Sequence, residues 1–135
     1  MIDLERMRSG IAGVLADADV KATVYTRAID GTAAFPLVWI GQPEVEMDPA
    51  VCELGDVWTV PIAVAVSRTG VSESDTQQSL EALWVDVARA LRDEIDGYHL
   101  AEVGHARLVK RAEAGSLDVQ GTVYPAQIIT IEIQG

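Results

Sequence analysis

Few residues in this chain are able to carry out nucleophilic or acid–base chemistry. It has one cysteine, Cys52, and two histidines, His99 and His105. A single cysteine excludes an internal disulfide and a thiolate metal site built by one chain. The histidines are six apart with Gly104 between them, a spacing that suits neither a helical metal pair nor one strand face. We expect no metal and no cofactor, and interpret both histidines as surface residues.

Carboxylates are abundant and are the next candidates for acid–base chemistry. Three groups stand close together in the sequence, namely Glu44 with Glu46, Glu73 with Asp75, and Asp93 with Glu94 and Asp96. Glycosidase-type catalysis needs one buried carboxyl of a pair with a raised pKa, whereas these groups fall in polar loops or at solvated helix ends. The chain also lacks a G-x-S-x-G elbow, a P-loop and a G-x-G-x-x-G motif. A Ser/His/acid triad stays open, since its members meet only in the fold. We nevertheless predict that the protein is not an enzyme.

The net charge of −11 is unevenly distributed. Residues 43–57 contain five acids and no base, and residues 73–96 contain seven acids against two arginines. Such a surface repels a phosphate backbone, so we do not expect the protein to grip nucleic acid. A smaller group of cations, Arg107, Lys110 and Arg111, either protects a strand edge or meets the acids of an identical neighbour. Contact of the second kind builds closed rings.

The hydrophobic pattern predicts an α+β fold with a mainly antiparallel sheet and two helices, in the order α-β-β-β-α-β-β. The predicted elements are a helix over 2–18, strands over 20–25, 36–41 and 58–67, a helix from a capping box at Ser74 to Gly97, and a hairpin with arms over 103–111 and 119–133. Residues 43–56 read as an acidic loop or a ragged edge strand. We expect a single domain over residues 1–135, with no signal peptide and no apolar run that could span a membrane.

Several details of this prediction concern single residues. Pro61 cannot donate to a ladder, which places its strand at an edge or at a bulge. The hairpin turn is expected at residues 113–116, and Pro125 is expected to interrupt the second arm. Trp58 follows the acidic loop and Phe35 precedes a proline at a loop end, so we interpret each as a core residue or as an anchor at an interface.

Four segments together show a familiar order: VYTRAIDGTAAFPLVWIGQPEVEMD, DVWTVPIAVAVSRTG, the helix start SDTQQSLEAL, and ITIEI near the end. This order resembles the small tail terminator (tail completion) proteins of long-tailed, non-contractile bacteriophages, especially those of actinobacterial hosts. The resemblance covers about residues 3–133. It rests on pattern, and it brings no catalytic residues with it.

The resemblance implies an α+β subunit of a hexameric ring that caps the tail tube and ends its polymerisation. Expected partners are identical copies, the tail tube protein and a neck or head-completion protein, with DNA passing through the lumen without specific binding and no membrane involved. The expected location is the tail–neck junction of the virion, after assembly in the host cytoplasm. Interface candidates are Arg27, Asp30, Phe35, Trp58, Arg107, Lys110 and Arg111. Candidates for an acidic lumen that repels DNA are Glu44, Glu46, Asp48, Glu53 and Asp56.

Other functions remain open at this point. Head-closure (stopper) and other neck proteins use similar small folds and rings. A small-molecule-binding domain or minor enzyme would use a cleft between the long helix and the sheet. An acidic DNA mimic would need acids spaced like phosphates, while the hydrophobic alternation here is that of an ordinary core.

Overall fold

The computed structural model describes residues 4–29, 32–46, 57–67, 72–93 and 105–134. It contains two helices and a mixed sheet of six strands, which confirms the α+β class. The elements are α1 (Leu4–Asp17), β1 (Thr23–Tyr25), β2 (Leu37–Ile40), β3 (Glu44–Glu46), β4 (Val57–Ala65), α2 (Glu73–Asp93), β5 (His105–Val119) and β6 (Thr122–Gln134). The predicted order holds broadly, with β3 as the short strand that was one alternative for the acidic segment.

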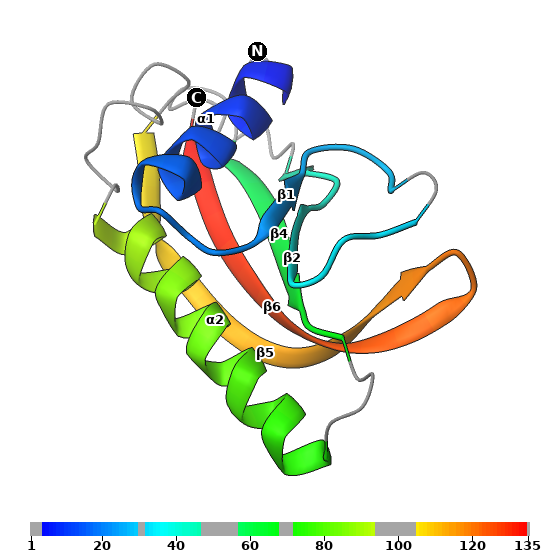
Figure 1. The fold of residues 1–135 in the computed structure, drawn as a ribbon. Coiled ribbons are helices and arrows are strands. Elements are labelled where there is room, and N and C mark those ends of the chain that lie inside the picture. The colour runs from blue at the N-terminus through cyan, green and yellow to red at the C-terminus, as the bar shows by residue number, and fades with distance from the viewer. Residues whose placement is uncertain (1–3, 30–31, 47–56, 68–71, 94–104, 135) are drawn as a thin grey trace.

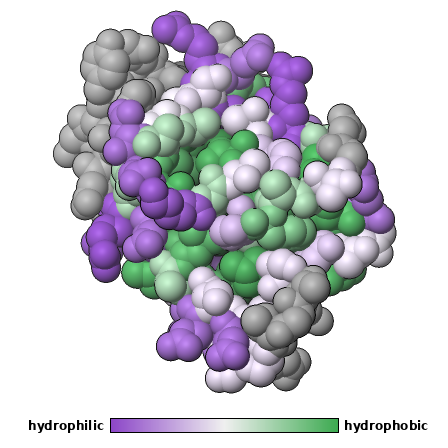
Figure 2. Space-filling view, viewed as in Figure 1, coloured by the Kyte–Doolittle hydropathy of each residue, from purple (hydrophilic) through white to green (hydrophobic). Residues whose placement is uncertain are grey.

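The strands lie in the order β1-β2-β4-β6-β5, and β3 also pairs with β4. The β1–β2 pair is parallel, while all other pairs are antiparallel. Figure 1 shows α1 and α2 on the same face of this curved sheet. In Figure 2, which has the same orientation, apolar residues lie toward the middle of this face, with many polar and charged residues around them.

The core lies between the two helices and the sheet. In α1 the residues Met7, Ile11, Val14 and Leu15 recur at helical spacing and are fully or almost fully buried. Alternate residues of β4 and β6 face them, because successive strand side chains point to opposite faces. From α2, Val87 and Leu91 belong to the same core.

The long helix α2 begins two residues earlier than a cap at Ser74 would place it. Ser72 is the cap, since its Oγ accepts a hydrogen bond from the backbone amide of Asp75 at 3.2 Å. The Ser72 carbonyl also accepts from the Thr76 amide at 2.9 Å and from Thr76 Oγ1 at 3.0 Å. Ser74 therefore lies within the helix, and the prediction that it caps the helix is wrong. Ser72 and Ser74 are both followed by polar residues, so the sequence pattern did not show which of the two serines caps the helix.

Pro61 lies in the middle of the sheet, so of the two alternatives given for its strand, an edge or a bulge, the edge is wrong. It is paired with Thr130 of β6 on one side. On its other side β2 ends at Ile40 and β3 starts at Glu44. Three residues there face only two residues of β4, so the irregularity lies in the neighbouring segment. A single hydrogen bond, from the Gly41 amide to the Pro61 carbonyl at 2.8 Å, closes this interval.

The hairpin turn is formed by Gln120 and Gly121, and the expected turn at 113–116 is wrong. Both turn residues have positive φ, 51° and 86°, as a two-residue hairpin turn of the primed type requires. The Gly121 amide donates to Asp118 Oδ1 at 2.9 Å. Pro125 is part of the ladder, opposite Ser116. It lies one residue beyond Ala126, the last β6 partner of β4, where no third strand needs its amide.

The end of the β5–β6 hairpin therefore projects past β4, as Figure 1 shows. On the face opposite the helices, its residues Leu117 and Val119 join a second apolar cluster with Leu37, Ala63, Ala65 and Ala126. The segment between β1 and β2 packs against this cluster, with the rings of Phe35 and Tyr124 4.6 Å apart. The molecule thus has two apolar clusters, one on each face of the sheet.

Candidate functional site

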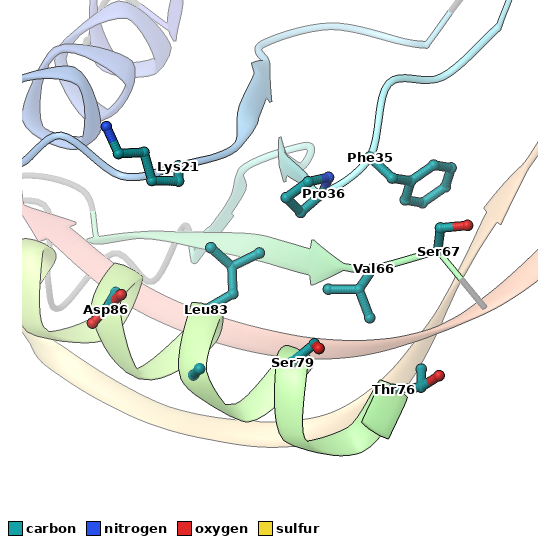
Figure 3. Close-up of a pocket in the computed structure, with 10 residues that line it drawn as sticks. Lys21, Phe35, Pro36, Val66, Ser67, Thr76, Ser79, Leu83 and Asp86 are labelled. Atoms are coloured by element: carbon teal, nitrogen blue, oxygen red, sulfur yellow. The ribbon is translucent and has the colours of Figure 1, made fainter. Parts of the chain in front are cut away.

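The first candidate site is a pocket of about 470 Å³ beside the N-terminal half of α2. Figure 3 shows α2 on one side of it and the segment around Phe35 and Pro36 on the other. Val66 and Ser67, the two residues that follow β4, lie between them. The complete described lining is Lys21, Phe35, Pro36, Val66, Ser67, Thr76, Ser79, Ala82, Leu83 and Asp86.

The Ser72 cap fixes where α2 begins and hence which of its residues reach the pocket. Thr76, Ser79, Leu83 and Asp86 follow at intervals of three or four residues, so they share one helix face. Thr76 is buried at 7% exposure, with its hydroxyl already donating to the Ser72 carbonyl. Its hydroxyl proton is therefore committed to the helix start.

The lining of this pocket combines apolar side chains with hydroxyl groups and two ionisable residues, Lys21 and Asp86. Its described lining contains no histidine and no cysteine. Lys21 Nζ lies 3.1 Å from Asp19, but both side chains are 83% exposed, so this ion pair contributes little to stability. The mixture of apolar groups with a few hydroxyls is typical of a small-molecule pocket. It also corresponds to the cleft between helix and sheet that the sequence left open.

A second pocket, of about 420 Å³, lies between α1 and the segments around β1 and β2. Its described lining is Arg8, Thr26, Arg27, Ala28, Trp39, Ile40, Gly41 and Gln42. The indole Nε1 of Trp39 donates to the Arg27 carbonyl at 3.1 Å and so ties the segment after β1 to β2. Arg27 Nη2 also donates to Glu5 Oε1 of α1 at 2.6 Å. Two arginines are thus brought to one pocket from distant parts of the sequence.

Two buried donors lack a hydrogen-bond partner within the described part of the chain, Arg8 Nε and Trp58 Nε1. A buried donor without an acceptor costs about 1–3 kcal/mol. Arg8 Nε belongs to a residue that lines the second pocket, whereas Trp58 is part of the core. Of these two residues, Arg8 is therefore the one that lies beside a described cavity.

Metal ligands are not grouped in the described structure. Across residues 4–29, 32–46, 57–67, 72–93 and 105–134, no three His, Cys, Asp or Glu side chains come together. Cys52, His99 and the acids Asp48, Glu53 and Asp56 lie outside those ranges.

The predicted interface residues have different surroundings. Arg27 is exposed and paired with Glu5, and Phe35 is half-buried between the first pocket and Tyr124. Arg111 is exposed and lies 3.3 Å from Glu113. Arg107 and Lys110 lie in β5, with side chains outside the described part, and Asp30 lies outside it altogether.

Trp58 is 6% exposed and packs in the helix-side core, which agrees with the first of the two interpretations given for it, a core residue. It shares its strand face with Val60 and Ile62, and this alternation carries it inward. Of the acidic lumen candidates, Glu44 is exposed in β3, and Glu46 lies in the same strand.

Sequence patterns did not single out Arg8, Lys21, Gln42 or Asp86 as pocket residues. Arg8 stands off the apolar stripe of α1, which is the only signal that it leaves the core. Lys21, Gln42 and Asp86 line a pocket only together with residues that are distant along the chain.

A scan against protein-family models finds no matching family, and a search of curated proteins finds no similar sequence. Neither of the two described helices is long and apolar enough to cross a membrane. We therefore infer function from the two pockets and the sheet edges.

Proposed function

We propose that this chain is a structural subunit of a virion, without catalytic activity, that forms a ring at the end of a phage tail tube. The ring would end tail polymerisation, join the tail to the neck and leave a lumen for DNA. The sequence resemblance to tail terminators supports the proposal. The observation that carries it in the structure is the β5–β6 hairpin, because it offers both a long edge and a projecting arm.

The edge is formed by β5, which has 15 residues and is the last strand of the sheet. No described strand pairs with its outer side. Unpaired backbone groups along an edge strand are a template for pairing with another chain. The opposite edge, β1, has only three residues and is a much smaller template.

The arm is the part of the hairpin beyond Ala126, where β6 pairs only with β5. Near its tip Val123 is 58% exposed, the larger of the two exposed values among the described large apolar residues. An exposed apolar side chain at the tip of an arm suits contact with another subunit. Edge and arm are different surfaces, and contacts between different surfaces generate rings when the rotation closes.

The charge of the chain suits a lumen through which DNA passes. At −11 the subunit repels phosphates, and Glu44 is exposed on β3. A ring would multiply this charge around its channel, so that DNA is not retained.

Light scattering at several concentrations, alone and with tail tube protein, tests the proposal. A discrete particle of six times the 14.5 kDa subunit mass is expected, at least in the presence of the tube. A strict monomer under both conditions would contradict the ring. Binding to a head-completion protein but not to the tube would favour the head-closure alternative.

Charge reversal in β5 tests the edge itself. Arg107, Lys110 and Arg111 are changed together to glutamate, and we expect loss of assembly because the proposal pairs these three cations with acids of a neighbouring subunit. The matched control reverses Lys21, Arg89 and Arg92, which are exposed and lie outside β5. Equal assembly of both variants would exclude the β5 edge as the contact.

The 470 Å³ pocket favours a second candidate, a small-molecule-binding domain. Leu83→Trp fills this pocket, and Val85→Trp, on the exposed side of α2, is its control. Screening would support this function if it finds a ligand whose binding is lost in Leu83→Trp but kept in Val85→Trp. If Leu83→Trp assembles normally, the binding function of the pocket is separate from ring formation.

A further inference from the structure

We infer that the pocket between α1 and the segments around β1 and β2 binds an oxyanion, a carboxylate or a phosphate group, through Arg8 and Arg27. This inference rests on the second pocket alone and does not depend on ring formation.

The first observation is the charge of the pocket. Its described lining contains two ionisable residues, and both are arginines. The chain has only ten lysines and arginines against 21 acids, so two cations in one cavity depart from its general character. Neutral residues with hydrogen-bonding groups, Thr26 and Gln42, complete its polar lining.

The second observation is the unsatisfied donor on Arg8. Its Nε is buried and has no partner among the described residues. Arg8 also lines the pocket, and the planar fork of arginine matches the two oxygens of a carboxylate or phosphate.

The third observation concerns Arg27, which already binds a carboxylate. Its Nη2 donates to Glu5 Oε1 at 2.6 Å, with both side chains 73% exposed. An exposed pair of this kind is weak and exchanges readily for a better acceptor. Glu5 therefore shows the preferred chemistry of Arg27 without blocking the cavity permanently.

The frame of the pocket is fixed by two hydrogen bonds to backbone carbonyls. Trp39 Nε1 donates to the Arg27 carbonyl, and the Gly41 amide donates to the Pro61 carbonyl. Neither of these two bonds uses the guanidinium group of Arg8 or Arg27. A preformed frame lowers the ordering cost of binding.

The same chemistry can come from two sources, a free anion or an acidic side chain of a second copy. Both present an oxygen pair to the arginines, and the chain is rich in carboxylates. A divalent metal is disfavoured because both charged groups are cationic.

Isothermal titration calorimetry with glutarate and with inorganic phosphate tests the site, at low ionic strength with chloride as the reference anion. We expect saturable binding of at least one of the two anions, and loss of about ten-fold or more in affinity in Arg8→Gln and in Arg27→Gln. The control Arg92→Gln removes an exposed arginine of α2 and should leave the affinity unchanged. No saturable binding, or equal losses in all three variants, would overturn the inference.

Circular dichroism accompanies each variant. If Arg8→Gln fails to fold, Arg27→Gln decides the question, because Arg27 is exposed and its loss is tolerated more easily. Sedimentation with and without the bound anion then identifies the source. Self-association weakened by the anion assigns the site to a neighbour's carboxylate, and unchanged self-association assigns it to a free anion.

Discussion

At the scale of single residues, Gly41 has the most demanding surroundings in the described chain. A β-carbon there would lie 2.9 Å from Pro61 Cγ and 2.9 Å from the Pro61 carbonyl oxygen. The second of these atoms is backbone and is already held by the Gly41 amide. Glycine is required because the segment between β2 and β3 must approach β4 closely, and this segment also lines the second pocket.

We therefore expect Gly41→Ala to lower the free energy of unfolding by about 1–3 kcal/mol, because backbone must shift to admit the methyl group. Urea denaturation measures this difference. Gly115→Ala is the control, since its β-carbon meets only the flexible side chain of Ile128, at 3.0 Å. There the change should stay below about 1 kcal/mol, because alanine is favoured over glycine within a strand. Equal losses would show that space at Gly41 is not decisive.

At the scale of elements, the start of α2 depends on Ser72. Its side chain and carbonyl bind three donors from the first helical turn, two of them on Thr76. The cap positions Thr76 and Leu83, and through them one wall of the first pocket.

Ser72→Ala should lower the free energy of unfolding by about 1 kcal/mol, because it leaves the Asp75 amide without its acceptor. Ser74→Ala should leave stability unchanged or raise it slightly, since alanine is the better helix former inside the helix. Thermal denaturation of the two variants distinguishes the caps. A larger loss of stability in Ser74→Ala than in Ser72→Ala would show that Ser74 caps the helix, as the sequence predicted.

Gly121, in the hairpin turn, is favoured by its backbone conformation, whereas Gly41 is required because space is lacking. A β-carbon on Gly121 would have no neighbour within 4 Å, yet its φ is 86°. Gly121→Ala should therefore destabilise by about 1–2 kcal/mol for conformational reasons alone.

At the preceding position, Gln120 has a φ of 51°, which asparagine adopts more easily. Gln120→Asn creates the Asn-Gly pair favoured in such turns, and we expect it to raise the unfolding midpoint. Equilibrium unfolding checks both substitutions. A stabilising Gly121→Ala, or a destabilising Gln120→Asn, would contradict a primed turn at these residues.

At the scale of the whole molecule, the charge of −11 opposes compact folding as well as DNA binding. Added salt screens this repulsion, and we expect the melting temperature to rise between low and physiological ionic strength by a few degrees, on the order of 1 kcal/mol. Calorimetry at one fixed protein concentration measures this change, since assembly would otherwise shift the midpoint. A melting temperature that falls with salt would show that attractive ion pairs outweigh the repulsion.

The sequence by itself determined the two helices, the main strands and the residues that face the core. Helical spacing in α1 and alternation in Trp58, Val60 and Ile62 are properties of single segments, so they are legible without any partner. The α+β class followed from the order of those segments. Local chemistry also marked Phe35 as an apolar residue at a loop end, although its partner Tyr124 was not evident.

Only the tertiary structure decided where the segments meet. Residues 113–116 combine small and polar side chains in the manner of a turn, although they lie within β5, so the sequence did not reveal that the turn lies at Gln120 and Gly121. Pro61 occupies a central strand because its neighbours break opposite it, which is a property of three segments together. Both pockets likewise join residues far apart in the chain, and only the folded structure shows that Arg8 and Arg27 line the same cavity.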